Sequence, residues 1–515
     1  MSAVGPQPQG SVFIGADPLS VDDIVRIADG AGVTLTQEAE GRIMASRAVV
    51  DEHLGLPEPV YGLNTGLGHM RNERMPEADL LAYQVAIVRL HDGALGRPLE
   101  TRIVRAAMAV RLAGIARGGS GMTLAAARTL AAMLDAGVHP IVPEHGSVGA
   151  SDLMSMACIA QVLIGEGAAE YGGERLPGGE AMRRAGIQTP TLQAKEGLGM
   201  VSANGVSIGQ GALVVARAAR VAAAADLVVA ATMEALRANP SIIEPAVAAA
   251  KPIPGQVDAA AHLRRLLRGS AILEPGAAAS VQDALSIRVV PQVHGALREL
   301  GRFTHEAVEG ELASMDDNPL VVVEEGRLIS NGNFHPMLMA LAFDALRPAL
   351  AHVGQLSDRR MNQLWQRLFA SGVDMVSVMA YAQQPGNGFL SRYAAAARAA
   401  DLRQLAAPAT LDIGALDLGV EDHATAAPTT VRRTEEALDA LETILLVELL
   451  IDRDLFAIVG RPEPQGVGVA AAMRVIDRVC LAAGGAVGRA PMAADVHALL
   501  RPLLSTEILD AADAA

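Results

Sequence analysis

The chain has 515 residues, of which 51% are hydrophobic but only 3% aromatic, so its core must be built from aliphatic side chains and 20 methionines. A formal net charge of −15 argues against nucleic acid or an anionic membrane as a partner, because both select a basic face. The apolar runs are interrupted by charges and glycines, which excludes a convincing membrane span.

The cysteine and histidine content narrows the possible classes of protein further. Cys158 and Cys480 are far apart and have no ligand-like spacing, so neither a disulfide framework nor a zinc site is expected. The 12 histidines show no HExxH spacing, and no phosphate-binding glycine motif is present. The N-terminus also has no basic stretch before an apolar core, so we expect a cytoplasmic protein without a bound metal or nucleotide.

The elements expected in the first part of the chain are mostly helical. After a flexible tail over residues 1–15, Ser20 should cap a first helix that ends near Gly30. Helical periodicity recurs at 79–92, 100–117 and 123–136, and short apolar runs around turns predict hairpins at 169–179 and 318–330. These features predict an N-terminal helical domain over 16–195.

The rest of the chain carries long helical patterns. They fill 197–236, 276–313, 334–371 and 430–459. Helices of this length indicate an extended bundle, which we assign to residues 196–515 together with the C-terminal helices.

Residues 146–165, GSVGASDLMSMACIAQVLIG, place a small flexible elbow before an apolar helix. Asp152 suits a helix N-cap there, because its carboxylate can accept the free N–H groups of the next turn. The alternative is a catalytic elbow.

Two further stretches carry candidate chemistry. YGLNTGLGHM, residues 61–70, is a glycine-rich loop that would hold Tyr61 at a mobile tip, although an ordinary surface loop reads the same way. QDALSIRVVPQVHG, residues 282–295, places Arg288 in an apolar run. That arginine needs either a structural acid or a substrate carboxylate, because its planar fork suits bidentate binding.

The order and spacing of these motifs resemble the aromatic amino acid ammonia-lyases, of the histidine ammonia-lyase type. The matching stretches are YGLNTGLG, QVAIVRLHDG, GSVGAS, KEGLGMVSANG, QDALSIRVVPQV, DDNPL, GNFH and PATLDIGALDLGVEDH, and they span about residues 20–500. The resemblance implies a mainly α fold with a long central bundle and a homotetramer that shares active sites between subunits. It also implies a carbon–nitrogen lyase acting on a small aromatic substrate.

The family's Ala-Ser-Gly triad cyclises to an electrophile, methylidene-imidazolone, but here Ala150 and Ser151 run directly into Asp152. Ring closure requires a compressed backbone for which glycine is best suited, so the sequence predicts that this cofactor is absent. Ser202 also stands at the family's asparagine position, two residues before Asn204, and Leu285 replaces a tyrosine. A smaller branch of the family, to which ergothionase belongs, is similar in its short triad.

The resemblance implies a role for each matching residue. Tyr61 would be the base for the β-proton if nearby charge lowers its pKa, Arg288 would hold the carboxylate, and Glu421 completes the expected catalytic set. The other implied substrate-binding residues are His91, Asn204, Gln282, Asn318, Phe334 and Asp152. Without the family match, His91 would be interpreted as a helix-end histidine stabilised by the helix dipole.

Three hypotheses follow. The chain is a lyase without the electrophile that releases trimethylamine from a histidine-like betaine, an ordinary ammonia-lyase, or a catalytically inactive scaffold. A trimethylammonium group leaves directly as a neutral amine, so a site without an electrophile favours the first hypothesis.

Overall fold

The computed structural model of the protein describes residues 10–15, 17–374, 376–377, 379, 388–411, 413–485 and 493–515. The described chain is mainly helical with four small sheets, as the sequence predicted. It divides into two compact units. Unit 1 contains residues 1–216, 305–342 and 409–432, and unit 2 contains 217–304, 343–408 and 433–515.

Unit 1 holds most of the shorter elements. Its helices are α1 (Val21–Ala28), α2 (Gln37–Leu54), α3 (Leu80–Leu90), α4 (Thr101–Ala116), α5 (Leu124–Ala136), α6 (Leu153–Leu163), α7 (Gly178–Arg184) and α8 (Glu196–Val201), with the short turns η1 (Gly68–Met70), η2 (Glu77–Asp79), η5 (Val323–Glu325) and η6 (Asp417–Gly419). Its strands are β1 (Val12–Ile14), β2 (Val33–Leu35), β3 (Leu95–Pro98), β4 (His139–Pro140), β5 (Pro143–His145), β6 (Ala168–Tyr171), β7 (Glu174–Pro177), β8 (Leu320–Val322) and β9 (Arg327–Ile329).

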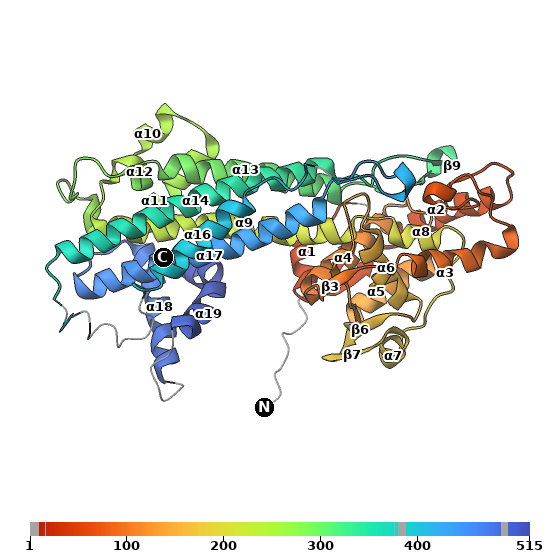
Figure 1. Ribbon diagram of the computed structural model, residues 1–515, viewed down its shortest axis with the longest axis horizontal. Helices are drawn as coiled ribbons and strands as arrows, with labels where there is room; N and C mark the ends of the chain where they lie inside the picture. Colours follow the sequence, from red (N-terminus) through yellow and green to blue (C-terminus); the bar gives the residue numbers. More distant parts are fainter. Residues whose placement is uncertain are drawn as a thin grey trace. The chain divides into compact units, whose positions relative to one another are not determined.

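Four long helices contribute residues to both units: α9 (Gly205–Leu236), α13 (Val290–Leu312), α14 (Met337–Ala370) and α17 (Ala427–Ile458). The other helices of unit 2 are α10 (Pro245–Ala250), α11 (Pro254–Leu266), α12 (Leu285–Arg288), α16 (Arg392–Leu405), α18 (Val467–Gly485), α19 (Ala493–Leu503) and α20 (Leu509–Asp513), with the turns η3 (Pro240–Ile243), η4 (Ala271–Leu273) and η7 (Leu504–Ile508). Figure 1 shows the long helices alongside one another in unit 2, where Glu448 of α17 bonds both Thr232 of α9 and Arg360 of α14.

The sheets are small, and two of them are the predicted hairpins. Strands β6 and β7 pair antiparallel, as do β8 and β9, because glycine turns at positive φ connect them. The tail predicted over residues 1–15 was too long. Residues 12–14 form β1, which pairs in parallel with β2 and buries Val12 and Ile14, while residues 1–9 lie outside the described residues.

Local signals explain where several helices begin. Ser20 caps the start of α1 as predicted, and the structure shows that it forms a capping box with Asp23. The helix expected over 276–313 begins only at Leu285, and the Asp283 side chain that precedes it accepts from the N–H of Asn239 at 2.7 Å. The helix is interrupted at Val289, and Pro291 lies in the first turn of α13. The domain division at residue 195 also differs from the two units, since unit 1 recruits the later segments 305–342 and 409–432.

One described helix, α14, is long and apolar enough to cross a membrane by length and composition. In the protein, 61% of its most apolar window is buried, as in the core helix of a bundle.

Candidate functional site

The Tyr61 loop lies in unit 1 and is held by its own asparagine. The side chain of Asn64 accepts from the N–H of Val60 at 2.7 Å and donates to the carbonyl of Glu58 at 2.9 Å. Leu63 packs into an apolar cluster with Val50 of α2. The loop is therefore anchored at its centre, and the expectation of a mobile tip is not supported by these contacts.

Tyr61 is half-buried, and its hydroxyl oxygen accepts from the N–H of Gly68 at 3.1 Å. Burial raises the pKa of Tyr61, and the carboxylates of Glu421 and Asp417 raise it further, although the Gly68 hydrogen bond opposes them. The sequence interpretation required a lowered pKa, so that condition is wrong for the free site. The physical reason is that burial disfavours the charged phenolate, and the acids Glu421 and Asp417 add to this effect against the opposing charge of Arg71.

Glu421 is presented by a tight turn. The backbones of Leu416 and Glu421 bond to each other, and Asp417 and Leu418 have left-handed φ values of 46° and 54°. Burial raises the pKa of Glu421, and the charge of Asp417 adds to that rise, whereas His91 lowers it. Glu421 therefore lies within electrostatic range of both Tyr61 and His91.

Asp417 fastens this turn to the Tyr61 loop. Its carboxylate accepts from the N–H of His69 at 2.9 Å and lies 2.6 Å from His69 Nδ1. Gly68 permits the approach, because a Cβ there would meet the Asp417 carboxylate oxygen at 1.8 Å. Sequence reasoning missed Asp417, although it lies inside the quoted motif PATLDIGALDLGVEDH.

His91 follows the last turn of α3. Its Nδ1 lies 2.7 Å from the carbonyl oxygen of Ile87, which only accepts, so Nδ1 carries the proton. In the neutral ring, Nε2 is then left as an acceptor. This arrangement combines both sequence interpretations: the histidine closes a helix end and also offers a free nitrogen beside Glu421.

The elbow around Ser151 is a compressed turn in unit 1. Gly149 and Ser151 both have left-handed φ values, 87° and 63°. The Ser151 N–H donates to the Phe334 carbonyl at 3.2 Å, and its hydroxyl lies 3.3 Å from that of Ser202. Ala150 and Ser151 are both buried.

Asp152 precedes α6, but its side chain does not cap that helix. It accepts instead from the N–H and the hydroxyl of Ser207, each at 2.7 Å, in the first turn of α9. Burial raises the pKa of Asp152, and the Ser207 hydrogen bonds oppose that rise. The predicted cap of α6 is therefore wrong: the carboxylate is a cap for a different helix.

The remaining candidates of unit 1 are Phe334, Asn204 and Asn318. Phe334 contributes its carbonyl, which also accepts from Asn204 Nδ2 at 2.9 Å. The side-chain oxygen of Asn318 accepts from the N–H of Asn331 at 3.0 Å, and this hydrogen bond orders a loop. A substrate contact for Asn318 stays a prediction.

Gln282 and Arg288 belong to unit 2. Gln282 is exposed, and its backbone forms a local turn with Ser280. Arg288 ends α12 and is half-buried, and no described carboxylate pairs with it. The sequence allowed Arg288 to pair either with a structural acid or with a substrate carboxylate. No structural acid is paired with Arg288 among the described residues.

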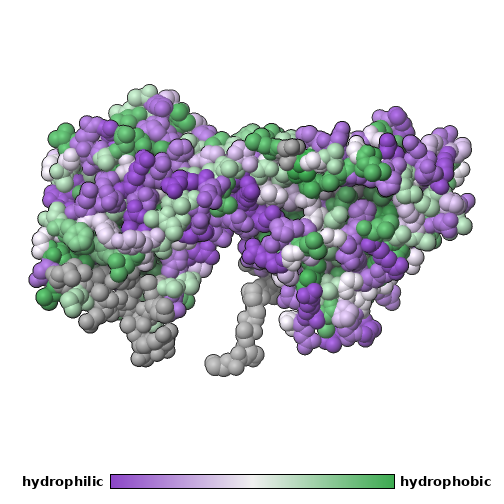
Figure 2. Space-filling view, viewed as in Figure 1, coloured by the Kyte–Doolittle hydropathy of each residue, from purple (hydrophilic) through white to green (hydrophobic). Residues whose placement is uncertain are grey.

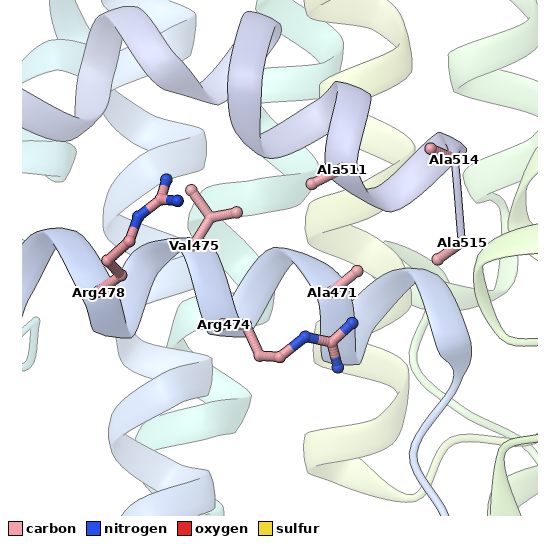
Figure 3. Close-up of a pocket in the computed structure, with 7 residues that line it drawn as sticks. All are labelled: Ala471, Arg474, Val475, Arg478, Ala511, Ala514 and Ala515. Carbon is pink, nitrogen blue, oxygen red and sulfur yellow. The ribbon is translucent and has the colours of Figure 1, made fainter.

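Two hollows lie in unit 2. One, of about 600 Å³, is lined by Leu285 and Ser286 beside polar residues of α14. The other, of about 520 Å³, lies between α18 and α20, where Arg474 and Arg478 extend in different directions (Figure 3). Neither hollow is lined by a predicted site residue. Within the described residues, no group of acidic, histidine and cysteine side chains is suited to a metal ion.

Comparisons with known proteins give a consistent result. The family model for aromatic amino acid lyases matches residues 19–478. Histidine ammonia-lyases from Anaeromyxobacter dehalogenans and Caldanaerobacter subterraneus are 38% and 36% identical to this chain over 455 and 442 residues. These matches cover 86% and 85% of this chain, and 89% and 86% of the relatives.

Solved structures agree on the fold. Histidine ammonia-lyase from Trypanosoma cruzi superposes with a TM-score of 0.85 at 27% identity, covering 98% of this chain and 95% of that one. Ergothionase from Treponema denticola superposes with a TM-score of 0.87, covering 97% and 99%. Its identity is 23%, so this likeness concerns the fold alone.

These comparisons correct the cofactor prediction. Relatives this similar over most of the chain are histidine ammonia-lyases, whose family carries the electrophile, so the absence inferred from one missing glycine is wrong. The left-handed backbone at Ser151 fits a compressed triad, and Ala150, Ser151 and Asp152 would hold the group. The third position departs from glycine, and the Asp152 N–H donates to the Ala203 carbonyl at 2.8 Å. Intact mass measures the ring directly, because its formation removes two waters.

Proposed function

Because this chain belongs to the aromatic amino acid lyase family and is a carbon–nitrogen lyase, we propose that it eliminates the α-amine of a histidine-like substrate to give an aryl acrylate. The observation that carries this proposal is that Glu421 of unit 1 lies within electrostatic range of both Tyr61 and His91. This arrangement combines a base for a carbon-bound proton with two groups that suit an imidazole ring.

Tyr61 is assigned the removal of the β-proton. The proton passes to the phenolate oxygen, the C–H electron pair forms the double bond, and the Cα–N bond breaks with its pair going to nitrogen. The Gly68 N–H stabilises the phenolate, and a cationic substrate adds the positive charge that the free site lacks.

His91 and Glu421 are assigned the ring of the substrate. The free Nε2 of His91 accepts an imidazole N–H, and Glu421 stabilises positive charge on the ring. A ring held in this way withdraws electrons from the neighbouring carbon, which makes the β-proton easier to remove. Arg288 is assigned the carboxylate, since no described acid occupies its guanidinium.

Two leaving groups remain candidates. A primary amine needs activation, which is the chemistry that the electrophile formed from the Ala150 triad supplies. A trimethylammonium group leaves directly as trimethylamine, and the acidic pair of Glu421 and Asp417 near Tyr61 favours such a permanent cation.

One experiment tests both candidate leaving groups. The purified protein is incubated with histidine, phenylalanine, tyrosine and the trimethyl betaines of histidine and its thioimidazole analogue. We expect a new conjugated-acid absorbance with an imidazole substrate, and the released amine, ammonia or trimethylamine, identifies the leaving group. Absence of an aryl acrylate from every substrate would overturn the proposal and favour the inactive scaffold.

A further inference from the structure

Asn204 is completely buried directly before α9, and its amide is only partly satisfied. Nδ2 donates to the carbonyl of Phe334, which fixes the orientation of the amide. The other atom, Oδ1, is buried and accepts no hydrogen bond from any residue within the described ranges. A buried acceptor without a donor is costly, so this oxygen indicates a ligand that supplies one.

The backbone of Asn204 is held by an acid from a distant segment. The Asn204 N–H donates to Asp316 Oδ2 at 2.9 Å, and Asp316 lies in the loop between α13 and β8. Asp316 is itself buried. The Asp316 carboxylate therefore determines the position of residue 204 through its backbone N–H. It is not one of the groups that the Asn204 side chain contacts.

Asp316 is in turn fixed by charges around it. Its neighbour Asp317 forms a bidentate pair with the fully buried Arg111, at 2.8 Å and 3.2 Å, and Arg111 lies 3.9 Å from Asp316. The buried Lys195 and the half-buried Glu311 complete the charged surroundings.

The pKa of Asp316 follows from these neighbours. Burial and the charge of Asp317 raise it to about 6, against the opposing charge of Arg111. Asp316 is thus ionised at neutral pH, which strengthens the hydrogen bond that it accepts from Asn204.

We propose that Asp316 is a positioning residue for Asn204: it holds residue 204 so that the free amide oxygen receives an N–H of the bound substrate. The inference rests on the proposed function, since a histidine-like substrate provides that N–H. Asp316 itself does not touch the substrate. Asp316 is the first residue of the sequence motif DDNPL, which assigned it no role.

Two substitutions distinguish a positioning role of Asp316 from an effect of its charge. Asp316→Ala removes the acceptor and frees residue 204, so we expect kcat/KM to fall by about tenfold or more, through KM and kcat together. Asp316→Asn keeps an acceptor oxygen in the same place and should recover most of that loss. Asn204→Ala should cost as much as Asp316→Ala, and the double variant should be no worse than Asn204→Ala, because both changes remove the same interaction.

A matched control removes another acid that holds one backbone N–H in unit 1. Glu309 accepts from the N–H of Val21 at 2.8 Å, far along the chain from Asn204. Glu309→Ala should lower thermal stability while leaving kcat/KM unchanged. Equal kinetics for Asp316→Ala and Glu309→Ala, or additive losses in the double variant, would overturn the inference.

A binding measurement distinguishes failure of the positioning role of Asp316 from failure of the proposed function. Calorimetric titration with the imidazole acrylate product needs no turnover. We expect weaker binding by Asp316→Ala and near-normal binding by Asp316→Asn. If the wild-type protein binds this product but turns over no substrate, only the proposed function fails; equal affinity in all variants, or no binding by the wild type, overturns the positioning role.

Discussion

Tyr61 illustrates how strongly the surroundings of a single side chain change its chemistry. The motif YGLNTGLG identifies the tyrosine, but the direction of its pKa shift depends on burial and on Glu421 and Asp417, which arrive from more than 350 residues away in the chain. In the free site the phenol is protonated at neutral pH, because both influences disfavour the phenolate.

The first prediction concerns this phenol. Tyr61→Phe should lower kcat by about a hundredfold or more, as expected for a lost general base. Because the pKa of Tyr61 is raised above its ordinary value of 10.0, the phenolate fraction grows as the pH rises, and kcat/KM should increase through the alkaline range up to that raised pKa. A pH–rate profile measures this, and a plateau reached near pH 7 would assign the base to another group.

Arg288 supports the second prediction. Arg288→Lys keeps the charge but loses the planar fork, so we expect a higher KM and a lower kcat. The control is Arg359→Lys, on the neighbouring hollow of unit 2, which should leave both constants near their wild-type values. If Arg288→Lys changed thermal stability alone, Arg288 would be structural.

At the scale of elements, acids at helix starts and between helices order the protein. Asp226 of α9 is completely buried and receives hydrogen bonds from His262 of α11 at 3.0 Å and from His294 of α13 at 2.6 Å, as well as from Arg298. His262 also bonds Asp513 of α20 at 2.7 Å. Both of its ring nitrogens therefore face carboxylates, which requires the doubly protonated ring.

The third prediction follows from that ring. Burial lowers the pKa of His262, but the bonds to Asp226 and Asp513 outweigh it and raise the pKa above 6.5. A raised histidine pKa contributes stability that is fully present below pH 6.5 and lost as the pH rises through the folded-state pKa. His262→Gln should lower the free energy of unfolding by about 1–3 kcal/mol below pH 6.5 and by less at higher pH. Denaturant unfolding at several pH values measures this, and a pH-independent loss would contradict it.

At the scale of the whole molecule, apolar side chains remain on the surface in both units. Figure 2 shows apolar patches among polar ones on the face in view. Strongly exposed examples are Leu418 at 88% in unit 1 and Val281 at 94% in unit 2. Contiguous exposed apolar surface is typical of an interface, so we propose that the chain assembles with copies of itself.

The fourth prediction is the state of that assembly. We expect a homotetramer, and light scattering at micromolar concentration should give four times the 53.3 kDa mass of one chain. Leu418→Glu, at the most exposed apolar position of its turn, should shift the distribution toward smaller species, whereas Phe13→Glu serves as a control on β1. A stable wild-type monomer would contradict the proposal.

The cytoplasmic localisation expected from the sequence stays a prediction.

The sequence by itself determined the elements and the family. Helical periodicity located most helices, Ser20 as a cap located the start of α1, and the glycine turns located both hairpins, because these signals depend only on neighbours in the chain. Ordered motifs across most of the chain identified the lyase family, since their spacing survives where single residues change.

The tertiary structure alone decided what each acid does. Asp152 caps α9 and not its own helix, Asp417 fixes the Tyr61 loop, and Asp316 holds Asn204. Each of these bonds joins segments from 55 to 348 residues apart, so no local pattern could have predicted it. The direction of the Tyr61 pKa shift belongs to the same class, because burial and the field of distant charges exist only once the chain has folded.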